Sequence, residues 1–277
     1  MTDVVLDALS RIVDREALGR GVMVVAAHPD DETIGAGALL THFPSAVVAH
    51  LTDGAPMDRR WWGAPEAESR EAYARLRARE LDAALGLAGV ARGRRYSLGR
   101  VDQRASLDLL GVACELAELI RATAPGALLT HPYEGGHPDH DAAAFAVRAA
   151  CALLEREGGA APAVLEFTSY FGSGDGIAVG GWIGPGTTPS VEIAYGAEDL
   201  ERKRGMLACF TSQRETIAQF PPGAERFRVA PAYDFARPPH DGQLHYERFE
   251  WGTTGHAWRS RAAQALEALG LAEVARC

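Results

Sequence analysis

Residues 22–32 have the sequence VMVVAAHPDDE. The run Val22–Ala27 is short, rich in β-branched residues and apolar at every position, a pattern typical of a strand buried within a parallel sheet. It ends abruptly at His28-Pro29-Asp30-Asp31-Glu32, and helix-compatible sequence follows to about His42. We therefore predict a buried strand, a polar turn and a helix, which form the first unit of an α/β fold.

Similar units follow along the first 155 residues. Further strands are expected at Ala46–Leu51, closed by Asp53-Gly54, and at Ala127–Thr130. Helices are expected over residues 4–18, 67–86, 106–122 and about 139–155. This alternation favours right-handed β-α-β crossovers. We predict a Rossmann-like α/β fold, with a mainly parallel sheet and helices on both faces.

The sequence changes character after Gly158. Short strands are expected at Val164–Tyr170 and Val191–Tyr195, with Gly-rich turns over 172–186 and a helix over 197–209. Residues 220–257 are rich in Pro, aromatic residues and His. We predict one domain over residues 1–277, with a core at about 20–155 and a C-terminal elaboration at about 156–277.

The composition excludes several classes of protein. Hydrophobic residues make up 47% and charged residues 23%, which is the balance of a globular protein and not of a disordered or coiled-coil chain. The net charge of −9 argues against binding to nucleic acid or to an anionic membrane surface. The first twenty residues do not resemble a signal peptide, and the nearby run Val22–Ala27 is too short to cross a bilayer. We expect a soluble cytoplasmic protein whose four scattered cysteines are buried free thiols.

A second polar cluster, Gly136-His137-Pro138-Asp139-His140, follows the expected strand at Ala127–Thr130 after a loop. Ligands of open α/β sheets bind beyond the carboxyl ends of the strands, so the two clusters are expected to converge. His28 and Asp31 are able to chelate one ion, and His140 would complete a set of two imidazoles and one carboxylate. Zinc and ferrous iron both suit such a set.

The remaining polar residues of the clusters suggest acid–base chemistry. Asp30 lies between two expected ligands, where its carboxylate would act as a general base toward a metal-activated water. His137 would stabilise an oxyanion and donate a proton to a leaving amine, with Asp139 holding its ring. These groups together favour metal-assisted hydrolysis of an amide. The alternative for each His-Pro-Asp turn is a purely structural helix cap.

The two clusters resemble those of the LmbE-like, or PIG-L, de-N-acetylase superfamily over roughly residues 20–155. The motifs that carry the resemblance are AHPDDE at 27–32 and GHPDH at 136–140, supported by Thr52-Asp53-Gly54 and Arg77-x-x-Glu80. The resemblance implies a Rossmann-like fold and zinc-dependent removal of acetyl from N-acetylglucosaminyl groups. It implies His28, Asp31 and His140 as ligands, Asp30 as base, and His137 as acid and oxyanion stabiliser oriented by Asp139.

The resemblance weakens toward the C-terminus. The family often carries His two residues before Ser212-Gln213, where this chain has Phe210, whose apolar side chain does not supply that polar contact. The loop after the second strand holds Arg59, Arg60, Trp61 and Trp62, which suit a sugar ring and an anionic group. Ordinary loop packing is the alternative for these four residues. Surface or packing roles are expected for His240, His245 and His256.

These observations predict a zinc-dependent N-deacetylase acting on an N-acetylated amino sugar or its conjugate, with one Zn²⁺ per chain. Two alternatives stay open. One is hydrolysis of a non-sugar N-acyl amide by the same groups, and the other is metal-dependent sugar binding without turnover. The expected partner is a small-molecule substrate, with no nucleic acid and no stable membrane insertion. The pattern predicts neither the aglycone nor the oligomeric state.

Overall fold

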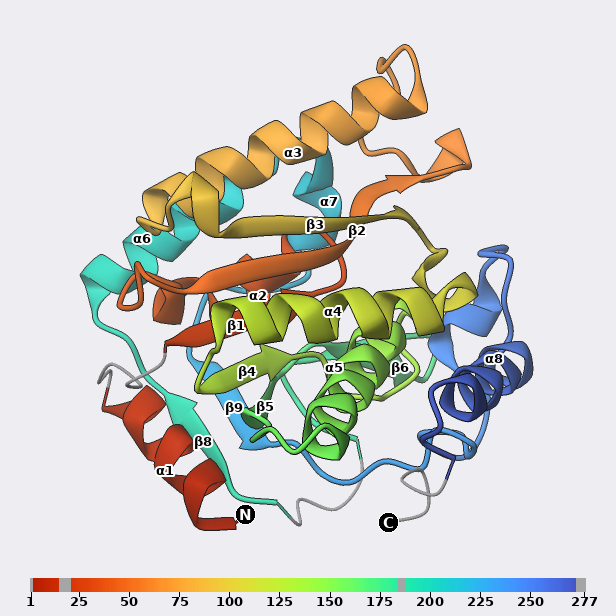
Figure 1. Cartoon of the computed structure of the whole chain (residues 1–277). Helices are drawn as coiled ribbons and strands as arrows, with labels where there is room; N and C mark the ends of the chain where they lie inside the picture. Colours follow the sequence, from red (N-terminus) through yellow and green to blue (C-terminus); the bar gives the residue numbers. More distant parts are fainter. Residues whose placement is uncertain (1, 15–20, 184–187, 273–277) are drawn as a thin grey trace.

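The computed structural model describes residues 2–14, 21–183 and 188–272. Its centre is a seven-stranded sheet in the order β3-β2-β1-β4-β5-β9-β8 (Figure 1). Five strands are parallel: β1 (Val22–Ala26), β2 (Val47–Pro56), β3 (Arg95–Asp102), β4 (Ala127–Thr130) and β5 (Ala163–Phe167). The last two neighbours in the sheet, β9 (Glu225–Val229) and β8 (Ser190–Ile193), each pair antiparallel with the strand before them. The predicted fold, a mainly parallel α/β sheet, is confirmed.

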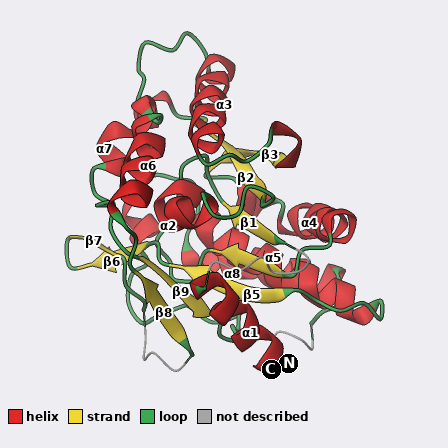
Figure 2. Cartoon of the chain, turned by 90° about the vertical axis from the view of Figure 1, so that its left-hand side faces the viewer, coloured by secondary structure: helices red, strands yellow, loops and turns green. Residues whose placement is uncertain are grey.

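Helices cover both faces of the sheet (Figures 1 and 2). One face packs against α4 (Leu109–Thr123), α5 (Pro138–Arg156) and α8 (Gly255–Ala268). The other packs against α1 (Thr2–Val13), α2 (Asp31–Leu40), α3 (Arg70–Leu87) and α6 (Ala197–Ala208). Successive strand residues point to opposite faces, so Met23 and Val25 join the first core and Val22 and Val24 the second. An uninterrupted apolar strand is therefore needed at β1.

The edge of the sheet at β2 and β3 differs from the expectation. Asp53-Gly54 was expected to close the second strand, but β2 continues through both residues to Pro56. The pairing of β2 with β3 shifts in register on either side of Thr52, so the turn residues form an irregularity within a strand. The strand β3 was not predicted, because its side chains are half-buried or exposed and form no apolar run.

The helix that follows the first polar turn is interrupted. Ala36 in α2 has non-helical angles of φ −144° and ψ 20°. The amides of Ala38 and Leu39 donate instead to the carboxylate of Glu225 on β9, at 2.7 and 3.0 Å. Lys203 on α6 donates to the same carboxylate at 2.8 Å and to the Ile34 carbonyl at 2.8 Å. A buried ion pair therefore satisfies the backbone groups that the interruption leaves unpaired.

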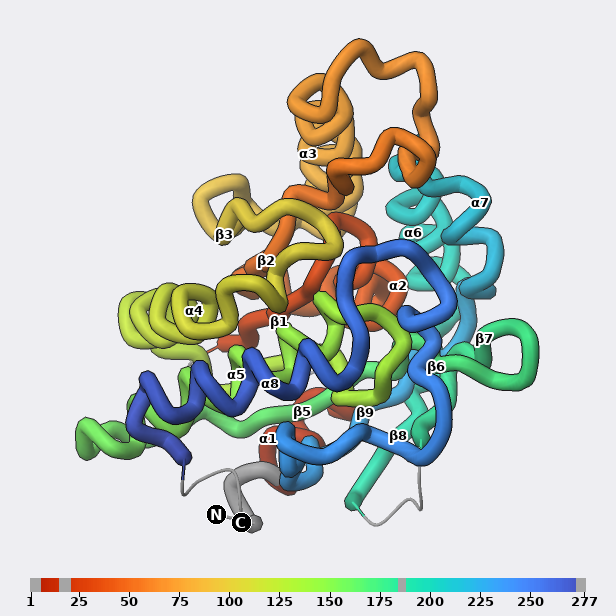
Figure 3. Tube along the Cα trace, turned by 90° about the vertical axis from the view of Figure 1, so that its right-hand side faces the viewer, coloured from red at the N-terminus to blue at the C-terminus, as the bar shows by residue number. Residues whose placement is uncertain are grey.

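The chain after β5 forms smaller elements. A hairpin of β6 (Tyr170–Ser173) and β7 (Gly176–Val179) matches the Gly-rich turns expected there, and α7 (Arg214–Ile217) follows α6. Between β9 and α8 the chain, blue in Figure 3, contains one short 3-10 helix, η5 (His245–Arg248). Other 3-10 turns are η1 (Arg59–Trp61), η2 (Arg92–Arg94), η3 (Ala105–Leu107) and η4 (Thr211–Gln213).

The described residues bear on three further expectations, which concern the cysteines, the end of the first helix and membrane-spanning segments. Cys151 is buried and Cys209 partly buried, but Cys114 is exposed, and all three are free thiols. Cys277 and residues 15–18, where the first helix was expected to continue, lie outside the described residues. Among the helices that the structure describes, none combines the length and the apolar character that crossing a membrane requires.

Candidate metal centre and active site

Both polar clusters lie where the sheet reverses its strand order. From β1 the chain builds outward through β2 and β3, and it then returns to the other side of β1 as β4. The turn His28–Asp31 follows β1 directly, and His137–His140 begins α5 after β4. β1 and β4 are adjacent and parallel, but the chain leaves their carboxyl ends toward opposite sides of the sheet. Such a switch point opens a crevice in which ligands bind. The predicted convergence of the clusters is therefore what the topology produces.

Asp31 lies between the other two expected metal ligands. Its Oδ2 is 3.1 Å from His28 Nδ1, and its Oδ1 is 3.3 Å from His140 Nε2. All three side chains are buried, and the two imidazole rings have centroids 5.3 Å apart. Burial acts to raise the pKa of Asp31, but the facing His140 and His131 lower it well below its usual value. The carboxylate is thus held in the ionised form that a metal ligand requires.

The donor atoms fit a divalent metal ion. Among the described residues, sets of ligand atoms lie within 4.8 Å of one another in three combinations. The combinations are His28, His137 and His140; His28, Asp102, His137 and Asp139; and Asp31, His131 and His140. The expected trio of His28, Asp31 and His140 is not one of these combinations. His28 and His140 belong to the first combination, and Asp31 and His140 belong to the third. Imidazole nitrogens with carboxylate oxygens are the donors that zinc and ferrous iron take.

Both expected imidazole ligands are fixed by a second contact. His140 Nδ1 is 3.1 Å from the hydroxyl of Ser169, which leaves Nε2 facing Asp31. His28 Nε2 lies 3.1 Å from Asp102 Oδ1 and 3.3 Å from Asp139 Oδ2. Burial opposes protonation of His28, but these carboxylates, Asp102 above all, raise its pKa well above 6.5. Contacts of this kind orient the ligating ring and select its tautomer.

Asp30 is held in an unusual conformation next to the ligands. Its φ of 141° lies in a region that residues other than glycine rarely adopt. The buried Arg77 on α3 donates through Nη2 to Asp30 Oδ2 at 2.9 Å and to the Pro29 carbonyl. Glu32 accepts from the Asp30 amide at 3.0 Å and contacts His50 at 2.8 Å. Burial raises the pKa of Asp30 to about 7, although Arg77 acts to lower it.

His137 and Asp139 make different contacts from those expected. The Asp139 carboxylate accepts from the amides of Gln103 and Ala105, at 2.6 and 3.0 Å, and its Oδ2 faces His28. Asp139 contacts His137 through its backbone amide, which donates to His137 Nδ1 at 3.2 Å. A neutral His137 ring therefore carries its proton on Nε2. Burial, with the nearby His28 and His140, lowers the pKa of His137 well below 6.5.

Three polar residues at the site were not predicted. His131 follows β4 directly and stacks on His140 with centroids 4.0 Å apart, but its Nε2 accepts from the Ala27 amide at 3.1 Å. Burial lowers the pKa of His131 to about 3, so it packs as a neutral ring. Asp102 ends the unpredicted strand β3, and Ser169 lies in the C-terminal part. Of these three residues, only His131 could have been found from the sequence, because it directly follows the strand expected at Ala127–Thr130.

The four residues expected to bind substrate separate into two groups. Trp62 is buried, stacks on Tyr73 at 5.3 Å and donates from Nε1 to the Pro56 carbonyl at 2.9 Å, so it packs the loop. Arg59 lies over the Trp62 ring, 5.5 Å from its centroid, and donates to the Pro65 carbonyl. Trp61 and Arg60 instead reach the C-terminal segment, where Arg60 Nη2 pairs with Glu250 at 3.0 Å.

Aromatic side chains of the C-terminal part line the histidines. The Trp251 ring lies 4.6 Å from the His137 ring, and Tyr170 lies 5.2 Å from His140. The buried His245 contacts Phe249 and Tyr170, as a packing role predicts. Phe210, which replaces the family's histidine, is buried in the core between the sheet and α6.

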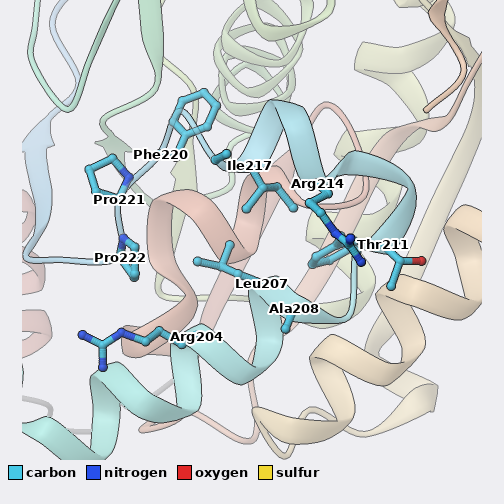
Figure 4. A pocket seen from close by; sticks show the side chains of 11 residues that line it. Arg204, Leu207, Ala208, Thr211, Arg214, Ile217, Phe220, Pro221 and Pro222 are labelled. Carbon is cyan, nitrogen blue, oxygen red and sulfur yellow. The ribbon is translucent and has the colours of Figure 1, made fainter. Parts of the chain in front are cut away.

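A separate groove of about 400 Å³ runs along α6 and α7 (Figure 4). Its lining is largely apolar, with Leu207, Ile217 and Phe220 among its residues and Arg204 and Arg214 at its sides. Neither of the two polar clusters contributes to the lining. The groove offers volume without acid–base groups, so the chemistry belongs to the crevice at β1 and β4.

Comparisons with known proteins agree with this location. Residues 23–151 match the family model PIG-L: GlcNAc-PI de-N-acetylase, which confirms the resemblance predicted from the two clusters. No match was found among curated proteins. The matched region ends before the segments that carry Ser169, Tyr170 and Trp251.

Solved structures share the fold at low sequence identity. The A40926 pseudoaglycone deacetylase Dbv21 is 16% identical, with a TM-score of 0.57 over 76% of this chain and 96% of that chain. A deacetylase of teicoplanin biosynthesis is 16% identical, with a TM-score of 0.55 over 75% and 96%. GalB, the 4-carboxy-2-hydroxymuconate hydratase of Pseudomonas putida KT2440, is 17% identical, with a TM-score of 0.54 over 76% and 96%. One fold thus supports hydrolysis and hydration, and the reaction must be argued from the site.

Proposed function

Residues 23–151 match the PIG-L family model, and from that match we propose that the protein is a metal-dependent deacetylase of N-acetylated amino sugars or their conjugates. The observation that carries the proposal is the contact of Asp31 with both His28 and His140, beside the buried carboxylate of Asp30. Such a set combines metal ligands with a proton acceptor that is itself outside the ligand set. Hydrolysis of an amide requires both.

We assign His28, Asp31 and His140 as ligands of one divalent ion, zinc first and ferrous iron as the alternative. A bound ion would polarise the acyl carbonyl and acidify a water molecule in the crevice. Ser169 fixes the His140 ring, and the Asp102 and Asp139 carboxylates fix the His28 ring. The metal would thus meet ligands that are already oriented.

Asp30 carries out the proton transfers, and His137 stabilises the oxyanion. Asp30 accepts a proton from the water that attacks the acyl carbon, while Nε2–H of His137 donates a hydrogen bond to the developing oxyanion. The carbon–nitrogen bond then breaks, and Asp30 returns the proton to the leaving amine. This last step differs from the sequence expectation, in which His137 is the acid. The reason is that His137 Nδ1 accepts a backbone hydrogen bond, which favours the neutral ring.

The C-terminal elaboration is proposed to form one domain with the core. Two observations support this. The apolar core on one face joins Leu116 and Phe145 to Trp258 of α8. The core on the other face joins Leu39 to Phe227 of β9. Both apolar layers therefore include side chains of the C-terminal elements.

The function is tested by loading the purified protein with Zn²⁺ or Fe²⁺ and offering a panel of N-acetylated amino sugars. Stoichiometric release of acetate and a primary amine is expected. Asp30→Asn, assayed in parallel with its metal content measured, is expected to keep the metal and lose turnover. A metal-replete Asp30→Asn protein with wild-type turnover would contradict the assigned base. Metal binding without release of amine from any N-acetyl compound would leave only the binding-protein alternative.

A further inference from the structure

Three aromatic side chains from two distant segments meet beside His137. Trp251 lies 4.6 Å from the His137 ring and stacks on Phe249 with centroids 4.5 Å apart. Trp61, almost two hundred residues earlier in the chain, makes edge contacts with both, at 5.8 and 5.9 Å. All three rings are half-buried. We call Trp61, Phe249 and Trp251 the aromatic wall.

The hydrogen bonds of the tryptophans distinguish the wall from the core. Two packing tryptophans are satisfied, because Trp62 Nε1 donates to the Pro56 carbonyl at 2.9 Å and Trp258 Nε1 to the Pro138 carbonyl at 3.0 Å. Within the described residues, the shielded Nε1 atoms of Trp61 and Trp251 have no hydrogen-bond partner. A shielded donor without a partner costs free energy, which a ligand oxygen would recover. The aromatic wall therefore has two indole N–H donors without partners, whereas the N–H groups of the two packing tryptophans are both paired.

The segment that carries Phe249 and Trp251 is held at both ends. Glu247 accepts from the amides of Leu244 and Gly255, at 3.1 and 2.7 Å, which closes the segment into a loop. The Arg60–Glu250 pair then joins the loop to the Trp61 turn. An ordered wall loses little conformational entropy on binding, so its contacts contribute more fully to affinity.

We propose that the aromatic wall is the subsite for the ring that carries the scissile N-acetyl group, and that it makes the site select amines on a saturated, hydroxylated ring over short acyclic amines. The inference rests on the proposed deacetylase function. A pyranose presents an apolar C–H face that packs on aromatic rings, and its hydroxyls accept from indole N–H groups. The position of Trp251 against His137 places this subsite next to the reacting carbonyl.

The test compares two substrates with the same acetyl group, the methyl glycoside of N-acetylglucosamine and N-acetylethanolamine. Trp251→Ala is expected to lower kcat/KM for the glycoside about tenfold, equivalent to about 1.4 kcal/mol and mostly through KM. For N-acetylethanolamine the change should stay within about threefold, with unchanged metal content. Trp182→Ala is the matched control, because its ring packs on the Arg228 guanidinium at 4.2 Å. Trp182→Ala should change kcat/KM for neither substrate.

A second, milder variant keeps the test valid if Trp251→Ala does not fold. Trp251→Phe keeps an aromatic ring but removes Nε1–H. It should lower kcat/KM for the glycoside about threefold and leave kcat/KM for N-acetylethanolamine unchanged. Equal losses on both substrates, or an unchanged KM for the glycoside in both variants, would overturn the subsite.

Failure of the proposed function is recognised separately. If wild-type protein releases amine from neither compound, calorimetric binding of the glycoside replaces turnover as the readout. A tenfold weaker Kd in Trp251→Ala would then retain the subsite without the reaction, whereas equal Kd values would overturn it.

Discussion

The region from β1 to α5 and the region from β5 to α8 contribute differently to the same crevice. The first supplies all the residues that we assign to metal binding or proton transfer, in the turns and first helical turns that follow the parallel strands β1 and β4. The second supplies Ser169 against His140 and Trp251 against His137, from a strand end and an irregular loop. Reactive groups thus come with recognisable motifs, while the side chains that orient and enclose them come from segments without a motif.

The largest effect is expected from removing a ligand in the first region. Asp31→Ala deletes the carboxylate between His28 and His140, leaving two buried imidazoles without their shared partner. Metal affinity should fall by more than the roughly 10–100-fold that is typical of outer partners. Metal analysis after dialysis measures this, with Asp53→Ala, on the half-buried part of β2, as the matched control. Stoichiometric metal in Asp31→Ala would remove Asp31 from the ligand set.

A smaller effect is expected from His137, which touches the reaction but is not assigned as a ligand. His137→Ala should lower kcat on the order of 10²-fold, since it removes one oxyanion donor. KM and metal content should change little, because the interaction strengthens only in the transition state. Steady-state kinetics on metal-replete protein measure it. If His137→Ala instead loses its metal, the ring belongs to the ligand set, in the combination with His28 and His140.

Ser169 tests whether the second region positions the first. Ser169→Ala removes the contact to His140 Nδ1, and a loss of about 10-fold in metal affinity or activity is expected. Ser169→Thr keeps a hydroxyl and should restore most of the loss. Ser173→Ala, at the exposed end of β6, is the control and should behave as wild type. Equal behaviour of Ser169→Ala and Ser173→Ala would mean that the second region only encloses the site.

The smallest effect concerns Glu134, which lies where the two regions meet. Its carboxylate is buried without a hydrogen-bond partner among the described residues, and burial, with Glu166, raises its pKa well above 4.5. The folded protein therefore retains a proton that the unfolded chain releases above about pH 4.5. Stability should fall as pH rises from there toward the folded pKa, by at most about 1.4 kcal/mol per pH unit.

Glu134→Gln keeps the shape and removes the titration. Denaturant unfolding of both proteins at several pH values should show a shallower decline for Glu134→Gln. Glu118→Gln, an exposed carboxylate on α4, is the control and should keep the wild-type slope. Identical slopes for wild type and Glu134→Gln would mean that the carboxylate is already ionised in the folded protein.

The sequence predicted the first region more completely than the second, for physical reasons. The strand at Ala127–Thr130 was predicted to the residue, because an apolar run between turn signals has few alternatives. Asp102 escaped prediction because its strand β3 is an edge strand with no buried face. Trp251 escaped prediction because its position against His137 depends on contacts across more than a hundred residues, which leave no local pattern.

The interruption of α2 bears on how the chain folds. The amides of Ala38 and Leu39 find their acceptor on Glu225, 187 and 186 residues later. Contacts of such long sequence separation form late, because loop-closure entropy opposes them until other contacts are in place. A fragment ending at residue 156 would leave two shielded amides unpaired, at about 1–3 kcal/mol each. The helix that begins at Asp31 is therefore expected to reach its final shape only after the distal strand β9 has docked. Formation of the crevice beside Asp31 and closure of the sheet would then be one cooperative event.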